Sequence, residues 1–523
     1  MDFKRFKLYP NGILGGIFLG FLFLSAAASA DTNTIAPTTS TTSGAAIAKN
    51  TDTTLNPTAT DVVNPNVSPT TVEPTTTTTE LPAIESPAPI VATPPVATPA
   101  PVVAPAPVVH TKPYLVKFEE ISAGDTAWML AATALVLLMT IPGLVLFYSG
   151  MVRKKNVLST ALQSFVICCL VTIIWVAIGY SIAFTPGVSP FLGSFDQVML
   201  SGLSYVKETS QVSVSHIAPT IPESVFVMFQ MTFAIITPAL IVGAFAERMR
   251  FTAMLLFMGL WSIFVYSPIA HCVWEPSGFF ASKGVLDFAG GTVVHINAGI
   301  AGLVCAYKLG PRRGYGKIPL IPYNLIYTLM GASFLWVGWF GFNAGSAVAS
   351  DGRAGMAMLV TQTATAVATM TWMFIELAVK KRITMLGCAS GAVAGLVAIT
   401  PASGFVGVNG SIYIGVAAGI FCYWGATGLK SILGADDALD VFGIHGIGGL
   451  VGAILTGVFA EKALSGLDAN VWMQTAAAFG TLVYSGIMTY IILVIVNFFV
   501  DLRVDAEEEE DGLDISQHSE RVH

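Results

Sequence analysis

Apolar runs of about 20 residues recur from residue 127 onward and constrain this chain more than any other feature. A helix needs roughly 20 apolar residues to cross the hydrocarbon core of a bilayer. The composition agrees, because 54% of the residues are hydrophobic and only 11% are charged. The sequence therefore predicts an all-α polytopic membrane protein. Its eleven transmembrane helices should begin near Ala127, Thr160, Ser224, Phe251, Gly290, Asn324, Gly355, Thr384, Gly410, Val441 and Met473.

Basic residues are distributed unevenly among the loops between these runs. Alternate loops hold clusters of Lys and Arg at 153–155, 248–250, 308–317 and 380–382, whereas the loops between them hold isolated basic residues. Short loops rich in Lys and Arg remain on the cytoplasmic side of a membrane. The charge pattern therefore places the N-terminus outside the cytoplasm, and an odd number of spans places the C-terminus inside it.

The first 30 residues have the pattern of a signal peptide. A basic start is followed by a short apolar stretch at 13–24 and then by Ala28-Ser29-Ala30. Such a combination is typical of a secretory signal that is removed after the small residues. An uncleaved membrane anchor is the alternative.

Three further segments complete the predicted organisation. Residues 31–111 are rich in Thr, Pro and Ala and predict a disordered extracytoplasmic tail. We expect the membrane domain to occupy residues 112–500. An acidic tail at 501–523 should follow it in the cytoplasm, so the chain is expected to be a multi-pass protein of the cell (inner) membrane.

Two histidines lie inside apolar, glycine-rich spans: His295 in GGTVVHINAGIAGLV and His445 in DVFGIHGIGGLVGAIL. Ionisable side chains at that depth are costly and usually face a pathway or a partner. The two spans are the fifth and the tenth, and similar residues follow each histidine. This spacing predicts a five-plus-five inverted repeat, which would bring both histidines to the middle of the membrane. A zinc site is not favoured, because zinc takes three or four protein ligands and no Cys, Asp or Glu completes the set. A histidine buried for packing is the plainer alternative.

Six segments, in order along the chain, resemble the signature segments of the bacterial ammonium transporter (Amt) branch of the Amt/Rh/Mep family. The resemblance extends from about residue 125 to residue 518 and implies a transporter, not an enzyme. The segments are MTIPGLVLFYSGMVRKKNVLS (139–159), FQMTF (229–233), GAFAERMRF (243–251), LDFAGGTVVHINAGIAGL (286–303), VGWFGFNAGSA (337–347) and DVFGIHGIGGLVG (440–452).

The resemblance also implies roles for individual residues. Trp274, Phe229 and Ser346 match an outer ammonium-recruitment site, where an aromatic face attracts a cation by roughly 1–2 kcal/mol. Phe233 and Phe342 match a gate of two phenyl rings, and His295 and His445 match the twin histidines of the pore. Trp339 is a candidate for pore lining. Without the resemblance, Trp274 would be read as an interfacial aromatic and the phenylalanines as core residues.

Three acidic residues near span ends need separate interpretation. Asp287 precedes the fifth span and Asp440 opens the tenth, where the helix dipole and free N–H groups stabilise a carboxylate. We therefore expect a structural and electrostatic role for Asp287, and helix capping by Asp440. Glu275 stands where relatives often have a glycine run after the tryptophan. We expect it to be a solvated loop residue, and the alternative is that it adds negative potential at the outer mouth.

The expected activity follows from the cost of moving charge. Ammonium resembles potassium in size and charge, and a bare ion in a low-dielectric pore costs of order 20 kcal/mol. We therefore expect the protein to recruit ammonium outside, deprotonate it, and conduct ammonia, with or without a proton, past the histidines into the cytoplasm. The alternatives are an ammonium sensor and an Rh-type ammonia/carbon dioxide channel. The presence of Trp274 and Ser346 favours the Amt branch.

Partners are also implied. The family resemblance suggests a homotrimer in the lipid bilayer and a P-II signalling protein docking at the cytoplasmic face, near the segment Gly512-Leu513-Asp514 and His518. Neither a cofactor nor a metal is expected. We expect no nucleic-acid partner for a chain of net charge −7 with an acidic run at 507–511.

Overall fold

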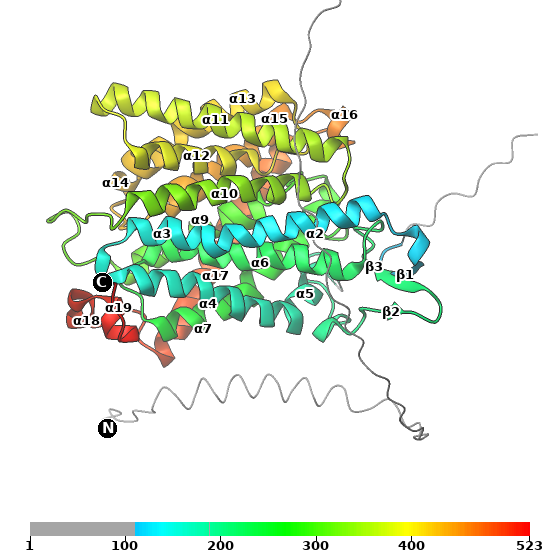
Figure 1. Cartoon of the computed structure of the whole chain (residues 1–523), viewed down its shortest axis with the longest axis horizontal. Helices are drawn as coiled ribbons and strands as arrows, with labels where there is room; N and C mark the ends of the chain where they lie inside the picture. Colours follow the sequence, from blue (N-terminus) through cyan, green and yellow to red (C-terminus); the bar gives the residue numbers. More distant parts are fainter. Residues whose placement is uncertain (1–109, 188, 523) are drawn as a thin grey trace, which may run out of the picture. The chain divides into compact units, whose positions relative to one another are not determined.

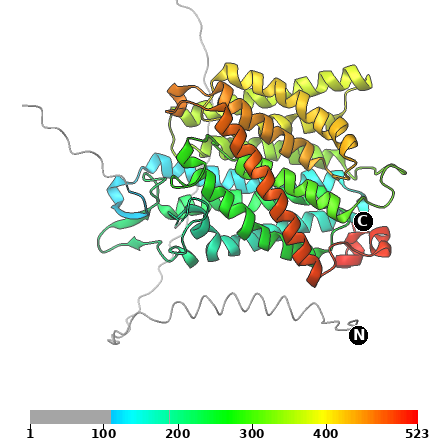
Figure 2. The same ribbon diagram turned by 180° about the vertical axis from the view of Figure 1, so that it is seen from behind.

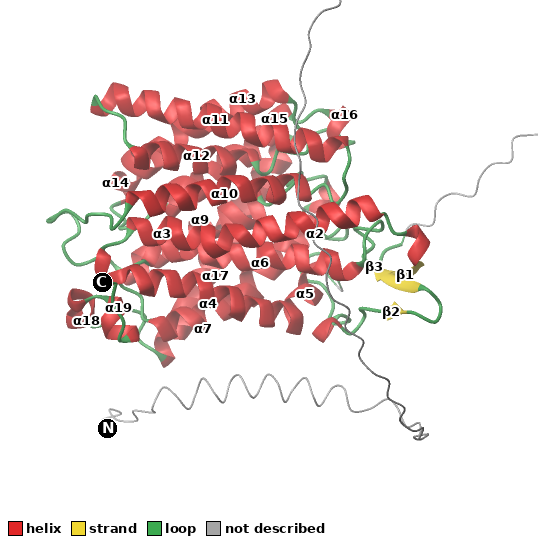
Figure 3. Cartoon of the chain, viewed as in Figure 1, coloured by secondary structure: helices red, strands yellow, loops and turns green. Residues whose placement is uncertain are grey.

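The computed structural model describes residues 110–187 and 189–522, and helices make up most of this part of the chain (Figures 1 and 3). The predicted signal peptide, and the predicted tail as far as residue 109, lie outside the described residues. Ten helical segments within the described part are long and apolar enough to cross a membrane. An eleventh apolar helix, α12 (Met385–Ile399), has 15 residues and occupies the position of the eighth predicted span.

Several of the long segments combine α-helix with π-helical turns, labelled η. The first five contain α2 (Ala123–Leu138), η2 (Met139–Leu144) and α3 (Val145–Met151); α4 (Val157–Ile174), η4 (Trp175–Gly179) and α5 (Tyr180–Phe184); α6 (Glu223–Phe245); α7 (Phe251–Trp261), η6 (Ser262–Tyr266) and α8 (Ser267–Trp274); and η8 (Gly291–Ile296) with α9 (Asn297–Leu309). The others contain α10 (Leu325–Gly345); α11 (Gly352–Lys380); α13 (Val408–Trp424), η9 (Gly425–Leu429) and α14 (Lys430–Leu433); η10 (Phe442–Gly446) with α15 (Ile447–Phe459); and α17 (Val471–Phe499).

Side-chain caps fix where many of these helices begin. An Asp, Asn, Ser or Thr oxygen accepts a hydrogen bond from a free N–H group of the first turn, which stabilises a helix start by about 1 kcal/mol. The residues that do so are Ser122, Asn324, Asp351, Thr384 and Asn470. Local sequence therefore explains where four of the ten long segments and α12 begin.

The two ends of the bundle differ. Three short strands, β1 (Tyr114–Lys117), β2 (Tyr205–Val206) and β3 (Gln211–Val214), form an antiparallel sheet in the order β1-β3-β2, with Tyr114 opposite Val214. This small sheet was not predicted. It lies at one end of the bundle, here called the sheet end, whereas α18 (Ala506–Asp511) and α19 (Leu513–His518) lie at the opposite, tail end (Figure 3).

Helix α6 forms the centre of the bundle and α17 crosses its outside. In α6, 89% of the most apolar window is buried, against 28% in α17. A helix that is apolar all round belongs in the interior. Figure 2 shows α17 running obliquely across the other helices towards the tail end. Among the ten long helical segments of the described chain, α6 is therefore the most deeply buried.

Candidate functional site

Trp274 ends α8 near the sheet end and is held from several sides. Its indole Nε1 donates a hydrogen bond to the backbone oxygen of Asp287 at 2.8 Å. Its ring is parallel to Phe184, with centroids 6.4 Å apart, and perpendicular to Phe233 at 5.7 Å. Because the N–H group and both rings fix its orientation, Trp274 presents a defined aromatic face rather than a mobile side chain.

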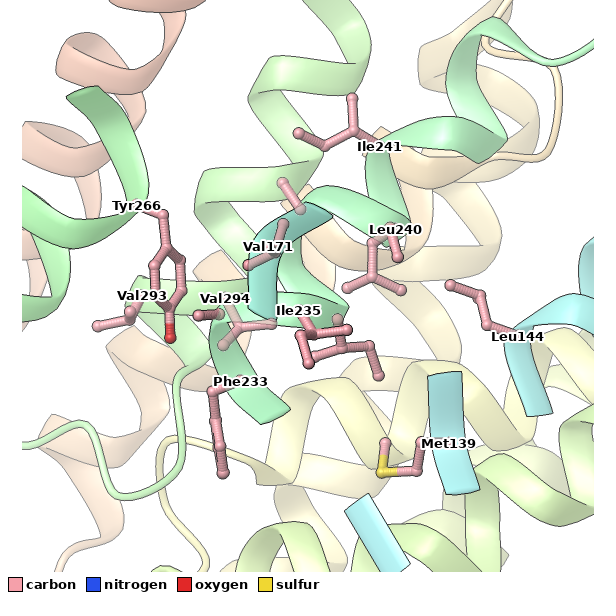
Figure 4. Close-up of a cluster of buried hydrophobic side chains, with 14 of the residues drawn as sticks. Met139, Leu144, Val171, Phe233, Ile235, Leu240, Ile241, Tyr266, Val293 and Val294 are labelled. Carbon is pink, nitrogen blue, oxygen red and sulfur yellow. The ribbon is translucent and has the colours of Figure 1, made fainter. Parts of the chain in front are cut away.

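Two phenyl rings follow Trp274 toward the middle of the bundle. Phe233 of α6 and Phe342 of α10 are both fully buried, and their rings stack with centroids 4.2 Å apart and 27° between planes. Phe229 lies one turn from Phe233 on the same face of α6, with centroids 5.0 Å apart. Figure 4 shows Phe233 among the apolar side chains of this region. The pair predicted as a gate is therefore in direct contact.

Ser346 lies at the end of α10, one turn beyond Phe342. Its hydroxyl donates to the backbone oxygen of Phe342 at 2.8 Å and is half-buried. The neighbouring Gly345 packs against the ring of Phe229, since a Cβ atom there would lie 2.9 Å from that ring. Ser346 is thus adjacent to the aromatic group formed by Phe229, Phe233 and Phe342.

His295 and His445 meet in the interior. Their Nδ1 atoms are 3.3 Å apart, and their rings are 5.3 Å apart at 23° between planes. Both side chains are buried, and both lie in π-helical turns, η8 and η10. Such turns are rare and often occur at functional sites. When both rings are neutral, one Nδ1 donates and the other accepts.

A close contact between two glycines brings the histidines together. A Cβ atom on Gly299 of α9 would collide with the backbone of Gly446, the residue after His445. A glycine on one helix lets the partner backbone approach more closely than any side chain would permit. The separation of the two imidazoles therefore depends on the absence of a side chain at Gly299.

Trp339 supports the His295 ring from the other face. The two rings stack with centroids 5.4 Å apart at 22°, and Trp339 also contacts Phe342 at 5.4 Å. The indole Nε1 of Trp339 donates to Thr400 Oγ1 at 2.9 Å. Thr400 was not predicted as part of the site, and no feature of its local sequence distinguishes it from other threonines in the spans.

A narrow cavity lies beside the histidine pair. The space open to the centre of a water-sized molecule is about 10 Å³, which is roughly what one water needs. Figure 4 shows Leu144 and Leu240 pointing toward each other in this region. The cavity is apolar except for the two imidazoles, and its lining is Met139, Leu144, Phe147, Ile236, Leu240, His295, Leu335, Trp339, Phe342, Val393 and His445.

The carboxylate of Asp287 caps the turn that contains His295. It accepts hydrogen bonds from four successive backbone N–H groups, those of residues 290–293, at 2.6 to 3.1 Å. The side chain is buried, and its backbone oxygen holds Trp274. Asp287 therefore links the aromatic group to the histidine turn, and its oxygens are occupied by the backbone.

The corresponding expectation for Asp440 is wrong. Asp437, not Asp440, accepts from the backbone N–H of Phe442 at 2.7 Å and so caps η10. Asp440 instead forms an ion pair with Lys430 at 2.7 Å. The sequence offers three carboxylates within five residues, and proximity to the helix start does not identify the one that turns inward. Burial raises the pKa of Asp437 to about 6.

The expectation for Glu275 is also wrong. Its side chain is 1% exposed, and it accepts from Ser277 Oγ at 2.9 Å. The other carboxylate oxygen lies 3.3 Å from Nε2 of His216, which is itself buried. His271, which gave no sign of a role, is fully buried as well. Glu275, the residue after Trp274 in the chain, is therefore part of a buried polar cluster with Ser277 and His216.

A network of buried charges lies at the tail end. Glu247 accepts hydrogen bonds from Arg153 Nε at 3.0 Å, Arg312 Nη1 at 3.1 Å and Asn156 Nδ2 at 3.0 Å. Arg312 also binds both carboxylate oxygens of Asp436, at 2.8 and 2.9 Å. Burial alone would raise the pKa of Glu247. The neighbouring cations Arg312 and Arg153 outweigh that effect and hold the pKa below its usual range. Every charge in this network has a close partner.

The C-terminal tail packs against this network instead of extending into solvent. Asp514 accepts from the backbone N–H groups of Leu158 at 3.1 Å and Ser159 at 2.8 Å, and so caps the start of α4. The backbone N–H of Leu513 donates to Asn156 Oδ1 at 2.8 Å. The tail after the acidic run therefore makes specific contacts with the start of α4.

Comparisons with known proteins bear on the family and the fold of the chain. The family described as "Ammonium Transporter Family" matches residues 127–523. The chain is similar to the ammonium transporter of Bacillus subtilis (strain 168), at 48% identity over 76% of this chain and 98% of the relative, and to that of Aquifex aeolicus (strain VF5), at 47% identity over 77% and 94%. Among solved structures, Candida albicans Mep2 has a TM-score of 0.68 at 34% identity over 75% of this chain and 88% of that one. A structure titled "Sensor Amt Protein" has a TM-score of 0.69 at 26% identity, over 76% and 98%.

Proposed function

Because this chain belongs to the ammonium transporter family, we propose that it transports ammonium along the line of rings from Trp274 to His445. The observation that supports this most directly is continuity. Trp274, Phe233, Phe342, His295 and His445 each contact the next, with ring centroids 4.2 to 6.1 Å apart. The line begins near the sheet end and reaches a buried apolar cavity. It is suited to a small molecule that changes from charged to neutral on the way.

The first step of the proposal is recruitment at Trp274, Phe229 and Ser346. The indole N–H of Trp274 donates to the backbone oxygen of Asp287, and the face of the ring takes no part in that hydrogen bond. An aromatic face attracts a partly desolvated cation by about 1–2 kcal/mol. The Ser346 hydroxyl donates to a backbone oxygen. Its remaining lone pairs can therefore accept a hydrogen bond from ammonium.

The second step is exclusion of the charge by Phe233 and Phe342. Stacked phenyl rings exclude water and offer a cation no full replacement for its hydration shell. Passage of a bare ion would cost of order 20 kcal/mol, whereas neutral ammonia avoids almost all of that cost. Ammonium can lose a proton and potassium cannot. The proposed gate therefore selects by chemistry, not by size.

The third step is passage along His295 and His445. The imidazoles share one hydrogen bond and present polar edges to a cavity that holds about one small molecule. Two histidines are too few for zinc. Within residues 110–522, no group of three His, Cys, Asp or Glu side chains is arranged to hold a metal ion. We propose that the pair hydrogen-bonds passing ammonia, with or without a proton moving alongside.

We propose that α12 completes eleven transmembrane helices arranged as a five-plus-five inverted repeat. The fourth and ninth spans both contain a π-helical turn, η6 and η9, and the fifth and tenth do also, η8 and η10. The tail end carries the basic loops, which favours a cytoplasmic tail end and an extracytoplasmic sheet end. Accessibility of cysteines introduced at Asp468 and Lys317, measured in intact cells, tests this orientation.

The remaining parts of the proposal concern processing and partners. We propose that residues 1–30 are a signal peptide, so N-terminal sequencing of the mature protein should begin near Asp31. We also propose a homotrimer in the inner membrane with a P-II protein docking at the tail end. The mass of the detergent-solubilised complex tests the trimer. Co-purification with purified P-II protein tests the docking.

An ammonium sensor is the alternative, because one similar structure is titled "Sensor Amt Protein". A sensor would bind ammonium at Trp274 without carrying a flux. An Rh-type channel is less well supported, since Trp274 and Ser346 would serve a cation. Ammonium flux measured on purified protein separates transport from sensing.

The experiment that tests the proposal measures currents and ammonium uptake in liposomes for wild type, His295→Ala and Trp274→Leu. Wild type should take up ammonium and exclude potassium. His295→Ala should lose at least 90% of the uptake, and Trp274→Leu should raise the half-saturating concentration without admitting potassium. Potassium conduction by wild type would contradict the deprotonation step, and unchanged uptake by His295→Ala would remove the histidine from the mechanism.

A further inference from the structure

A buried glutamine of α17 binds the backbone beside Asp287. Gln474 lies near the start of this helix and is 2% exposed, although α17 is the least buried of the ten long segments. Its amide oxygen accepts from the backbone N–H of Leu286 at 2.7 Å, and its amide nitrogen donates to the backbone oxygen of Leu286 at 2.6 Å. The same nitrogen lies 3.3 Å from the backbone oxygen of Ala453 in α15. Gln474 therefore binds both polar backbone groups of one residue.

These two hydrogen bonds fix the segment that precedes Asp287. Leu286 is buried and lies outside helices and strands, so its backbone groups need partners that regular structure does not supply. A glutamine amide has one acceptor and one donor group, as a peptide group has, and can pair with both. Because a peptide group is planar, the Leu286 oxygen and the N–H of Asp287 turn together. Gln474 thereby limits rotation of the peptide group that leads into Asp287.

The next peptide group of this segment holds Trp274. The backbone oxygen of Asp287 accepts from the indole N–H at 2.8 Å, and the N–H of Phe288, in the same peptide plane, donates to the oxygen of Pro401 at 3.1 Å. The ring of Phe288 is confined as well, since a Cβ atom on Gly404 would overlap it. Two consecutive peptide groups are therefore fixed, and the first of them is bound to α17 through Gln474.

The Asp287 carboxylate is held by a different part of the chain. It accepts from the N–H groups of residues 290–293, which belong to the turn that contains His295. A displacement of the backbone at Leu286 should therefore move the Asp287 oxygen that binds Trp274 more than it moves the His295 turn. The contacts separate an effect on recruitment from an effect on the later steps.

We propose that Gln474 is a positioning residue of the recruitment site, which sets the affinity for ammonium by fixing the backbone oxygen that orients Trp274. This inference rests on the proposed function of Trp274. A cation is attracted to the face of an aromatic ring, so a rotation of the ring weakens the attraction. Without Gln474, the segment that supplies the oxygen for the indole N–H is less firmly held. Gln474 acts through the backbone, since its own amide is occupied by Leu286.

The test measures ammonium uptake by purified full-length protein in liposomes for Gln474→Met and Gln163→Met, and for Gln474→Met combined with Trp274→Leu. Methionine is unbranched like glutamine but cannot donate to the Leu286 oxygen. Gln163 of α4 is the matched control, because it is a buried glutamine whose amide oxygen has no partner within residues 110–522. Uptake is measured against ammonium concentration, which separates the half-saturating concentration from the maximal rate.

Gln474→Met should raise the half-saturating ammonium concentration about fivefold and leave the maximal rate within about twofold of wild type. In the Trp274→Leu background the same substitution should change the half-saturating concentration by less than about 1.5-fold, because the residue through which it acts is gone. Gln163→Met should change neither quantity by more than about twofold. A purely structural role of Gln474 would instead lower the maximal rate in both backgrounds.

The contrary results are distinct. An unchanged half-saturating concentration in Gln474→Met, with normal uptake by wild type, overturns this inference and leaves the proposed function intact. A fall in maximal rate alone, or an equal rise in half-saturation with and without Trp274, also overturns it. If Gln474→Met does not fold, Gln474→Asn decides the matter: its shorter side chain cannot reach both groups of Leu286, so unchanged affinity overturns the inference. Absence of uptake by wild type instead contradicts the proposed function itself.

Discussion

The histidine pair and the charge network at the tail end are both buried and polar, but they use their hydrogen-bonding capacity differently. His295 and His445 share one hydrogen bond, and Nε2 of His295 has no partner within residues 110–522. Glu247 accepts from three side chains, and Arg312 binds two carboxylates. Each charge of the network has a close partner of opposite charge, whereas the histidine pair keeps a ring nitrogen free to bind a passing molecule. The comparison distinguishes the network that stabilises the bundle from the pair that we propose contacts the transported molecule.

The largest expected effect is in the charge network at the tail end. Arg312→Ala leaves the buried carboxylates of Glu247 and Asp436 without their shared cation, and removing one partner of a buried ion pair costs about 3–5 kcal/mol. The free energy of unfolding of detergent-solubilised protein, measured with denaturant, should fall by this amount. Lys462→Ala removes one partner of the exposed pair with Asp468 and should cost less than about 1 kcal/mol. Equal losses in the two variants would contradict the distinction.

A second prediction concerns Asp437, a carboxylate at the tail end whose ionised form lowers the free energy of unfolding. Burial raises its pKa to about 6, so the folded protein holds its proton more tightly than the unfolded chain does. The stability from this group is fully present below about pH 4 and is lost as the pH rises through 6. Over that range the loss is on the order of 3 kcal/mol. Asp437→Asn retains an acceptor for Phe442 and should unfold with a flatter pH dependence between pH 4 and 6.

Asp437→Asn should also equal or exceed wild type in stability at pH 7. The measurement is the denaturation midpoint at several pH values. A steeper dependence in the variant than in wild type would show that the sign assigned to Asp437 is wrong.

The third prediction tests the glycine contact on which the histidine pair depends. A methyl group in Gly299→Ala would collide with the backbone of Gly446, and overpacking of this kind costs about 1–3 kcal/mol. Because the contact sets the separation of the imidazoles, ammonium uptake should fall by about tenfold. Gly355→Ala is the control, because that exposed glycine of α11 has open space around its Cβ position. It should increase stability by up to about 1 kcal/mol and leave uptake unchanged. Normal uptake by Gly299→Ala would separate the glycine contact from transport.

The smallest expected effect is at the support of His295. Trp339→Phe keeps a ring against the imidazole and removes the hydrogen bond to Thr400, which costs about 1 kcal/mol. Uptake should fall two- to fivefold because the supporting ring is less firmly oriented. Thr400→Val should have a similar effect, and the double variant should be no worse than either single one. Additive losses would show that the two residues act separately.

The sequence predicted the parts of the molecule that depend on local pattern. The family is confirmed, and each of the eleven apolar runs from residue 127 onward coincides with a helix, because hydrophobic length and capping residues such as Asn324 and Asp351 are local properties. The order of Trp274, the phenyl rings and the histidines came from the family resemblance, and composition alone could not have supplied it.

The features that the sequence did not predict share one physical cause, which is that they depend on contacts between distant or similar residues. Glu275 pairs with His216 at a separation of 59 residues, and Trp339 pairs with Thr400 at 61, so no local pattern reveals either contact. Asp437 and Asp440 are three residues apart and chemically alike, so only the path of the backbone decides which one turns inward to cap a helix. The small sheet joins strands whose sequences are too short to carry a signal of their own.

The cap that Asp514 places on α4 has a consequence for biosynthesis. Asp514 follows Leu158 by 356 residues, and a ribosome adds about 5–20 residues each second. The backbone N–H groups of Leu158 and Ser159 are therefore synthesised about 20 to 70 seconds before the Asp514 carboxylate that accepts their hydrogen bonds. One of the earliest spans to enter the membrane is thus among the last to be completed, and a nascent chain interrupted before Leu513 would leave that helix end open.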